Sequence, residues 1–139
     1  GPKELMRHIC KVHQFGIMSA PTTAQFAGIE AIRSGEDDIE RMRNQYDIRR
    51  RYLLGELRTM GLECFEPQGA FYMFPSITST GLSCEEFCER LLREQKVAVV
   101  PGNAFGASGE GHVRISYSYS MNHLREACFR IRKFLQSLS

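Results

Sequence analysis

Arg114 is the residue whose type and setting most suggest chemistry. The run His112–Tyr117 reads as a short β-strand, and its alternation puts Val113 and Ile115 on a core face and Arg114 on the opposite face. A guanidinium presents a rigid fork of donors that matches a carboxylate with two parallel hydrogen bonds. The same pattern also describes an arginine in a surface ion pair, which contributes about 0–1 kcal/mol. The pattern alone favours the ion pair, so a carboxylate site needs further support.

The segments next to this strand carry weaker signals. The glycine-rich loop Gly106–Gly111 could cradle a phosphate, but no Gly-Lys-Ser/Thr follows it and it leads into a strand rather than a helix. A loop that connects two strands is the simpler interpretation. The turn Pro67–Gly69 and the following Phe71 indicate no chemistry by themselves, because phenylalanine belongs more often to a core than to a site.

The other reactive side chains form no recognisable catalytic or metal-binding set. The four histidines lack a carboxylate at catalytic spacing, and no Ser-His-Asp or Cys-His arrangement is supported. Cys84 and Cys88 would share one helix face, but two thiols do not complete a zinc site. Five cysteines, an odd number, without a signal-peptide pattern predict reduced thiols in a cytoplasmic protein rather than a disulfide framework.

The charge balance argues against nucleic acid as a partner. Eighteen basic and sixteen acidic residues give a net charge of +2, whereas nucleic-acid-binding domains usually have a pI above about 9 and a basic stripe. The basic run Arg49–Arg51 follows acidic residues on the same predicted helix, which favours a solvated helix face over a binding patch. The sequence contains no apolar stretch of the roughly eighteen residues that a membrane span needs.

The first part of the chain reads as helices. Apolar spacing predicts helices over residues 3–15 and 22–32, the second opened by a capping box of Thr22 with Gln25. A longer helix over residues 36–60, closed by Gly61, would extend for about 37 Å. Because that exceeds what a compact domain of this size needs, we expect it to pack along more than its own domain.

The remaining chain predicts an α/β unit that carries Arg114. Strands are expected over residues 62–66, 70–74, 97–100 and 112–117. Ser83, in a capping box with Glu86, opens one helix, and Ser120 opens the last. The last helix carries an apolar stripe of Leu124, Cys128, Ile131 and Phe134. This order predicts a small two-layer α/β sheet with helices on one face, preceded by a helical extension and the long helix.

Three segments in this order carry a family resemblance. They are PQGAFYMFP at residues 67–75, VAVVPGNAFG at 97–106 and GEGHVRISYS at 109–118. Together they resemble the C-terminal small domain of class I, fold-type I pyridoxal-phosphate-dependent aminotransferases, of the branch similar to aspartate aminotransferases. GPKELM at the start and SAPTTAQFAGIEAI at residues 19–32 also look like this family. Each motif is loose, but five in the right order make chance a poor explanation.

The resemblance implies roles for the matched positions. Residues 1–35 would come from the junction of the large and small domains, and residues 36–139 would form the small domain with its long linking helix. Arg114 matches the arginine that grips the substrate α-carboxylate. Gly69 and Phe71 resemble the turn that lines the active site as the small domain closes. In the same way, the loop with Asn103 and Phe105 resembles one beside the substrate entrance.

The resemblance also implies what this chain lacks. The cofactor of the family, pyridoxal 5'-phosphate, forms a Schiff base with a lysine of the large domain, and none of Lys3, Lys11, Lys96 and Lys133 stands in that motif. We therefore expect no catalytic and no cofactor-binding residue in this chain, and no activity of the chain alone. The parent would be a cytoplasmic homodimer that transfers an amino group between an amino acid and a 2-oxo acid. Residues Ser19–Thr22 would approach the site of the neighbouring subunit.

Two alternatives remain. A related pyridoxal-phosphate enzyme, such as a carbon–sulfur lyase or a synthase, would share these motifs. A free-standing α/β module could use Arg114 to bind a small acid. A piece of a larger enzyme should leave an apolar patch exposed on its first two helices and on the long helix, whereas a module that evolved to stand alone should not. The start at Gly1-Pro2 indicates either a tag remnant or a piece of a longer chain.

Overall fold

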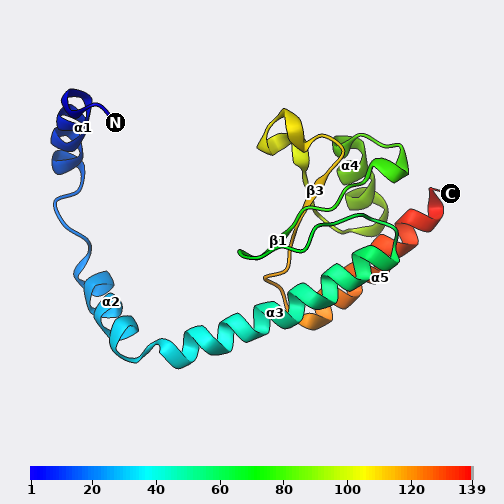
Figure 1. Ribbon diagram of the computed structural model, residues 1–139, viewed down its shortest axis with the longest axis horizontal. Helices are drawn as coiled ribbons and strands as arrows, with labels where there is room; N and C mark the ends of the chain where they lie inside the picture. Colours follow the sequence, from blue (N-terminus) through cyan, green and yellow to red (C-terminus); the bar gives the residue numbers. More distant parts are fainter. Residues whose placement is uncertain (139) are drawn as a thin grey trace. The chain divides into compact units, whose positions relative to one another are not determined.

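The structure, a computed structural model, describes residues 1–138 as five α-helices and three short strands with three 3₁₀ turns (Figure 1). The helices are α1 (Lys3–Gly16), α2 (Thr22–Ser34), α3 (Glu36–Thr59), α4 (Cys84–Gln95) and α5 (Met121–Ser137). The strands are β1 (Tyr72–Met73), β2 (Val100–Pro101) and β3 (Val113–Ser116). The 3₁₀ turns are η1 (Thr78–Thr80), η2 (Gly102–Phe105) and η3 (Ala107–Gly109).

The chain divides into two compact units, Gly1–Met42 and the remainder from Arg43 onward. The division falls inside α3, so this helix contributes to both units. The gap between α2 and α3 lies at Gly35, where the predicted boundary stands. That a domain boundary lies between residues 35 and 36 stays a prediction.

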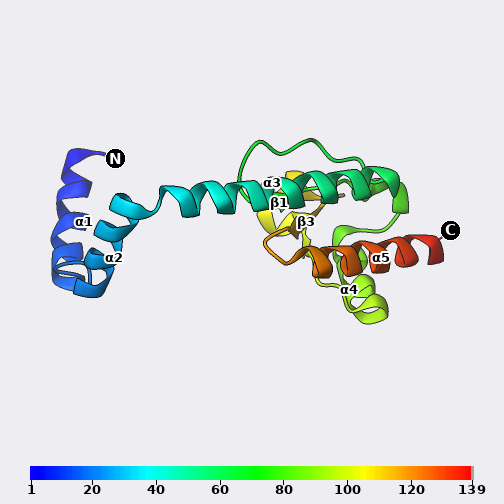
Figure 2. The same ribbon diagram turned by 90° about the horizontal axis from the view of Figure 1, so that it is seen from below.

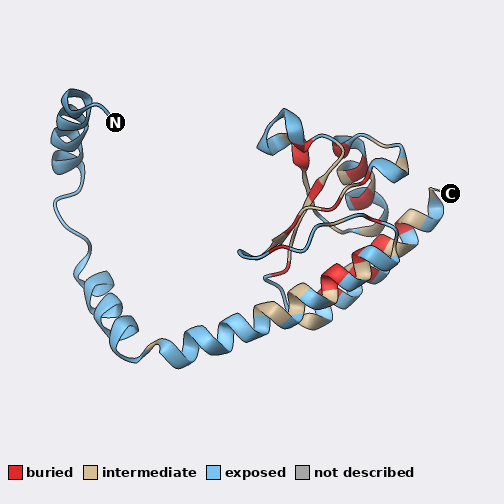
Figure 3. Cartoon of the chain, in the orientation of Figure 1, coloured by how far each residue is buried: buried red, intermediate tan, exposed pale blue. Residues whose placement is uncertain are grey.

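The first unit buries nothing within itself. The predicted helices are present with nearly the expected bounds, but no residue of α1 or α2 is buried, and both helices are exposed throughout in Figure 3. The capping box of Thr22 is wrong: Pro21 caps α2 without a side-chain hydrogen bond, and the Gln25 amide donates instead to the carbonyl of Ala20, at 2.8 Å. The exposed apolar side chains are Leu5, Met6, Ile9, Val12, Phe15, Ile17, Met18, Phe26, Ile29, Ile32, Ile39 and Met42.

The second unit is built on a three-stranded sheet with β3 in the middle. Both pairings are antiparallel, with Met73 opposite Ile115 and Val100 opposite Arg114. The predicted two-layer α/β arrangement is confirmed, although the strands are shorter than expected. Of the predicted strand over 97–100, only Val100 pairs in the sheet.

The strand predicted over residues 62–66 is wrong. Gly61 ends α3 in the left-handed region at φ +79°, and the amide of Leu62 turns back to donate to the carbonyl of Leu57 at 3.0 Å. This helix-end geometry buries Leu62 against the helix rather than in a ladder. Hydrogen bonds rather than a strand ladder join this stretch to the segment after β1, one of them from the Ser76 amide to the Glu63 carbonyl at 2.8 Å.

The helices of the second unit begin at the predicted caps. Ser83 Oγ accepts from the Glu86 amide at 3.2 Å and opens α4. In the same way, Ser120 Oγ accepts from the amide of His123 at 3.3 Å and opens α5. Lys96 ends α4 at φ +58°. Hydroxyl caps of this kind satisfy amides that no helical carbonyl can reach.

The core lies between one face of the sheet and helices α3, α4 and α5. Val113 points into it as predicted, Ile115 is partly buried against it, and Tyr117 is buried in it as well. Phe87 of α4 meets Phe134 of α5 edge to face with ring centroids 5.3 Å apart. Figures 1 and 2 show α5 running beside the C-terminal half of α3. The buried apolar residues are Leu53, Leu54, Leu57, Leu62, Met73, Ile77, Cys84, Phe87, Leu91, Val113, Tyr117, Leu124, Cys128, Ile131 and Phe134. The whole predicted stripe of α5 is therefore in the core.

Candidate functional site

Arg114 lies on the face of β3 that points away from this core. Its guanidinium carbon is 4.3 Å from the ring centroid of Tyr72 and 4.5 Å from that of Phe105. Tyr72 belongs to β1 and stands opposite Ser116, so it is a diagonal neighbour of Arg114 on the same face. The guanidinium is therefore held between two aromatic rings, which contact its faces and leave its edge of donors uncovered.

Arg114 has no acidic partner. Within residues 1–138, its guanidinium makes no hydrogen bond and no ion pair, although the residue is half-buried. The surface ion pair that the pattern favoured is therefore wrong for the described chain. Other arginines of the same unit do pair: Arg50 contacts both Asp47 and Glu66. A half-buried guanidinium with stacked faces and free donors is suited to a planar anion such as a carboxylate.

Phe105 reaches Arg114 from the loop between β2 and β3. The loop folds back on itself so tightly that a Cβ on Gly102 would lie 2.1 Å from the carbonyl oxygen of Gly109. The amide of Gly102 also donates to the carbonyl of His112 at 2.9 Å. Beside Phe105, the rings of Phe74 and His112 stack with centroids 5.4 Å apart, and Phe105 meets Phe74 edge to face at 6.2 Å.

The other predicted loop features do not join this cluster. The side-chain amide of Asn103 points to α4, where it donates to Glu85 Oε1 at 3.1 Å. The amides of Gly106 and Gly109 donate to carbonyls of the loop itself, at 3.1 and 2.9 Å. Since those two donors are taken by the loop itself, the geometry favours a connection between strands over a phosphate cradle.

Phe71 lies next to the cluster rather than in contact with Arg114. Its ring stacks on that of Tyr46 from α3, with centroids 5.9 Å apart, and approaches the ring of Tyr72 at 4.6 Å. Phe71 is 38 % exposed, so part of its ring faces open space. Gly69 is exposed, and a Cβ added there would meet nothing within 4 Å. The structure thus brings Arg114 and Phe105 together, with Phe71 one ring away.

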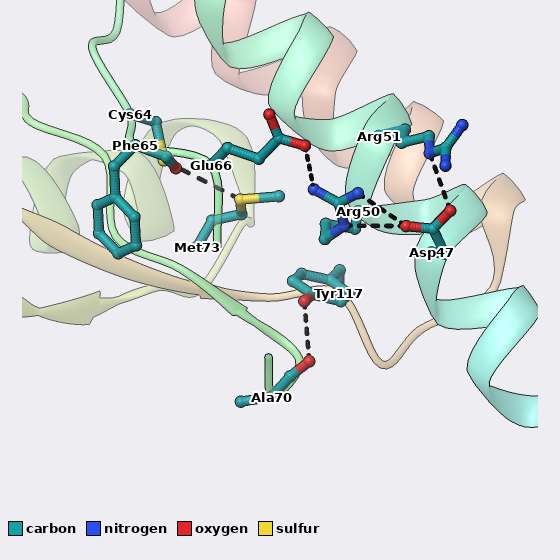
Figure 4. A network of polar contacts seen from close by, with 9 residues as sticks. All are labelled: Asp47, Arg50, Arg51, Cys64, Phe65, Glu66, Ala70, Met73 and Tyr117. Carbon is teal, nitrogen blue, oxygen red and sulfur yellow. Dashed lines mark hydrogen bonds and ion pairs between the residues drawn. The ribbon is translucent and has the colours of Figure 1, made fainter. Parts of the chain in front are cut away.

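A polar network fixes the segment that leads to Phe71 (Figure 4). Arg50 of α3 donates to Asp47 Oδ1 at 2.8 Å and to Glu66 Oε1 at 2.6 Å. The Arg50 hydrogen bonds hold the pKa of both carboxyls below their usual range. Further along, the Tyr117 hydroxyl donates to the Ala70 carbonyl at 2.9 Å. Two separate contacts therefore anchor residues 66–70.

The network also corrects the prediction for the basic run 49–51. Only 17 % of the Arg50 side chain is exposed, against 74 % for Arg51. Arg49 is half-buried and lies 5.5 Å from the ring of Tyr46. Of the three arginines, therefore, only Arg51 lies on a solvated helix face. Sequence reasoning also missed Tyr72, although alternation along 70–74 would place it on the same face as Phe74.

Comparison with known proteins identifies the family. Residues 1–131 match the family model described as aminotransferase class I and II. The chain belongs to this family. It is 44 % identical over 138 residues to an aspartate aminotransferase of Pyrococcus horikoshii, a match that covers 97 % of this chain and 35 % of that protein. The chain thus spans about a third of the length of such relatives, and the match lies in their C-terminal part.

Solved structures share the fold. A Pyrococcus structure described as protein-A1 superposes with a TM-score of 0.90 at 38 % identity, covering 100 % of this chain and 37 % of that one. A Thermus thermophilus aspartate aminotransferase solved with maleate superposes with a TM-score of 0.82 at 38 % identity, covering 96 % and 35 %. The predicted resemblance to the small domain of aspartate-aminotransferase-like enzymes is confirmed.

The family uses pyridoxal 5'-phosphate, but the residues present here do not fit that cofactor. A Schiff-base lysine has to be desolvated. All four lysines, Lys3, Lys11, Lys96 and Lys133, are exposed, and Lys96 donates to the Arg93 carbonyl at 2.9 Å. Among the residues that the structure describes, no group of three or more His, Cys, Asp or Glu could hold a metal ion. No helix in this part of the chain is long and apolar enough to cross a membrane.

Proposed function

We propose that this chain is the substrate-carboxylate-binding part of a pyridoxal-phosphate-dependent aminotransferase. The observation that carries the proposal is the state of Arg114, whose faces are stacked and whose donors have no partner within residues 1–138. An amino acid and a 2-oxo acid share one group that such an arginine recognises, the α-carboxylate. The parent enzyme would move an amino group between the two.

The aromatic rings would make Arg114 a better carboxylate ligand in two ways. Tyr72 and Phe105 restrict the guanidinium to one plane, so less rotational freedom is lost when a substrate binds. They also exclude water from its faces, which strengthens charge-assisted hydrogen bonds at its edge. The maleate in the Thermus thermophilus relative is a dicarboxylate, which fits a site of this chemistry.

Phe71 would contribute a wall of the same site. Its partly exposed ring stands beside Tyr72, and the segment before it is held by Arg50 and Tyr117. We propose that this edge closes over the substrate and keeps it oriented and dry. Within residues 1–138, no hydrogen bond joins Gly69 or Asn103 to Arg114, so we propose that any part they take is in shaping the entrance. The homodimer and the cytoplasmic location of the parent stay predictions.

Arg114→Ala in the full-length protein that contains this chain tests the proposal. We expect kcat/KM to fall about 30-fold or more, since removing one partner of a charge pair costs about 2–5 kcal/mol. Cofactor absorbance should not change, because the cofactor would be held by other parts of the enzyme. Arg125→Ala is the matched control, on the exposed side of α5. An unchanged kcat/KM for the Arg114 variant would refute the proposal.

Two observations bear on the alternative functions, a related lyase or synthase and a free-standing binding module. The relatives named above include aspartate aminotransferases, which favours transamination over a lyase or synthase reaction. The free-standing module is disfavoured by the apolar side chains of α1 and α2, none of which is buried. Lyase activity of the full-length protein on a sulfur amino acid, without transamination, would reverse the first preference.

A further inference from the structure

Glu110 connects the loop that carries Phe105 to the first turn of α4. Its Oε1 accepts from the backbone amide of Cys84 at 3.0 Å, and its Oε2 accepts from the Cys84 thiol at 3.1 Å. Both carboxylate oxygens therefore contact one residue that lies 26 positions away in the sequence, and the Gly111 amide and the Asn103 side chain also hydrogen-bond this carboxylate. Such contacts fix the position of the loop and not only the end of the helix.

A second contact anchors the other end of the same loop. Asn103 donates to Glu85, which is next to Cys84 in the first turn of α4. Next to the two anchors in the chain, Gly102 and Gly109 lie too close together for any side chain, since a Cβ on Gly109 would be 2.0 Å from the Gly102 carbonyl oxygen. The loop is thus closed at its base and attached to α4 on both sides.

Phe105 lies between these anchors and is not held by the core. The residue is 51 % exposed, and its ring contacts are Phe74 and Arg114. An exposed ring on a loose loop would sample many positions, because little burial favours any one of them. What keeps Phe105 over the guanidinium is therefore the shape of the loop.

We propose that Glu110 is a positioning residue for Arg114, acting through the loop that holds Phe105 on the guanidinium. The inference rests on the proposed function, in which Arg114 binds the substrate carboxylate. It assigns a role to a side chain that touches neither Arg114 nor the open face of the sheet. A simple stabilising contact at the end of α4 would leave the surroundings of Arg114 unchanged, and that difference can be measured.

The first measurement is the side-chain Nε–H resonance of Arg114 by NMR in the 139-residue chain. The ring of Phe105 shifts this resonance, and Phe105→Leu gives its position without the ring. We expect Glu110→Ala to move the resonance toward that position, with the fold intact. Glu110→Gln keeps the shape of the side chain and should move it in the same direction by less. Glu89→Gln is the control, because Glu89 pairs only with Arg93 on the exposed side of α4.

The second measurement is the steady-state kinetics of the same variants in the full-length protein. Weakening one aromatic contact to a guanidinium corresponds to a KM about 3- to 10-fold higher, and kcat should change less than KM. We expect KM to rise by a similar factor in Glu110→Ala and in Phe105→Leu. An Arg114 resonance unchanged in both Glu110 variants would overturn the inference. Where Glu110→Ala does not fold, Glu110→Gln alone decides.

The two proposals fail in different ways. If Arg114→Ala leaves kcat/KM unchanged, the proposed function fails, whatever the Glu110 variants do to the spectrum. If Arg114→Ala lowers kcat/KM while both Glu110 variants keep the resonance and KM of the original chain, the function stands and the positioning role of Glu110 fails.

Discussion

The hydroxyl of Tyr117 donates to the carbonyl of Ala70 at 2.9 Å, and Ala70 is held at φ +59°. A residue with a Cβ pays about 1–2 kcal/mol for this left-handed conformation. The amide of Tyr117 also donates to the carbonyl of Phe71 at 2.9 Å, so one residue fixes two consecutive carbonyls. The turn that presents Phe71 therefore depends on a tyrosine that is 1 % exposed.

Tyr117→Phe should lower the free energy of unfolding by about 1 kcal/mol, because it removes one hydrogen bond and keeps the packing of the ring. Urea unfolding measures the change. Tyr119→Phe is the control, since Tyr119 is 62 % exposed and should change stability by less than about 0.5 kcal/mol. Equal effects of the two substitutions would show that the bond to Ala70 contributes nothing.

Two phenylalanines of α5 should differ in how much stability is lost when alanine replaces them. Phe134 is 0 % exposed and Phe129 is 64 % exposed. Replacing Phe134 with alanine leaves a cavity against Phe87 and should cost about 3–5 kcal/mol. Phe129→Ala should cost less than about 0.5 kcal/mol. A large loss at Phe129 in urea unfolding would mean that α5 packs by a different face.

The contacts of the Glu110 carboxylate predict how the stability of the fold depends on pH. Hydrogen bonds from the Cys84 amide and then from its thiol hold the pKa of Glu110 below its ordinary value of 4.5. Because the folded state binds the proton less tightly than the unfolded state, this group stabilises the fold above about pH 4.5. Its contribution is lost as the pH falls through the lowered pKa.

Glu110→Gln should therefore lose less stability than the original chain when the pH falls from about 6 to about 3. The midpoints of urea unfolding at several pH values measure the difference. Asp47 and Glu66 titrate in the same direction in both proteins, so the comparison isolates Glu110. Parallel pH profiles would show that the Cys84 contacts do not form.

The cysteines should react with a thiol reagent in a fixed order. Cys10 is exposed, whereas burial raises the pKa of Cys88 and of Cys128 to about 11. At pH 8 a thiol with that pKa is only about 0.1 % thiolate, and the thiolate is the reactive form. Mass spectrometry after brief labelling should find Cys10 modified and Cys128 intact, and Cys10→Ser should remove the fast phase. Early labelling of Cys128 in the folded chain would contradict its burial.

The second unit should fold without the first. Every buried apolar residue lies between Leu53 and Phe134, and none precedes Arg43. A chain that begins at Arg43 should unfold cooperatively, with a urea midpoint close to that of the full 139 residues. A non-cooperative transition would show that residues 1–42 support the core.

The sequence was informative where local patterns decide the structure. The helices, the serine caps at Ser83 and Ser120, and the core stripe of α5 depend on neighbours within four residues, so spacing predicts them. The strand expected over 62–66 failed because Gly61 turns the chain and gives Leu62 a burial site against α3. Apolar residues after a helix can either form a strand or pack back against the helix, and only the tertiary packing decides between the two.

Parts of the candidate site could not be predicted in the same way. The position of Arg114 on its strand face follows from alternation, but its aromatic neighbours come from β1, distant in sequence, and from a loop whose fold no local spacing predicts. The strand register that brings Tyr72 diagonal to Arg114 is set by pairing across more than forty residues. The contact of Glu110 with Cys84 depends on where the loop meets α4, which no local spacing encodes.

The position of β3 in the sheet determines when the sheet can close during synthesis. This strand lies between β1 and β2 in space but follows both in the chain. At about 5–20 residues per second, a ribosome makes Val113 roughly 2–8 s after Tyr72. Until β3 is made, β1 lacks its pairing partner in the described sheet, and β2 lacks the same partner from the time it is synthesised. Met73, and later Phe87, also lack part of the core that covers them. Translation thus delays closure of the core until β3 and α5 arrive, and the nascent chain carries exposed strand edges until then.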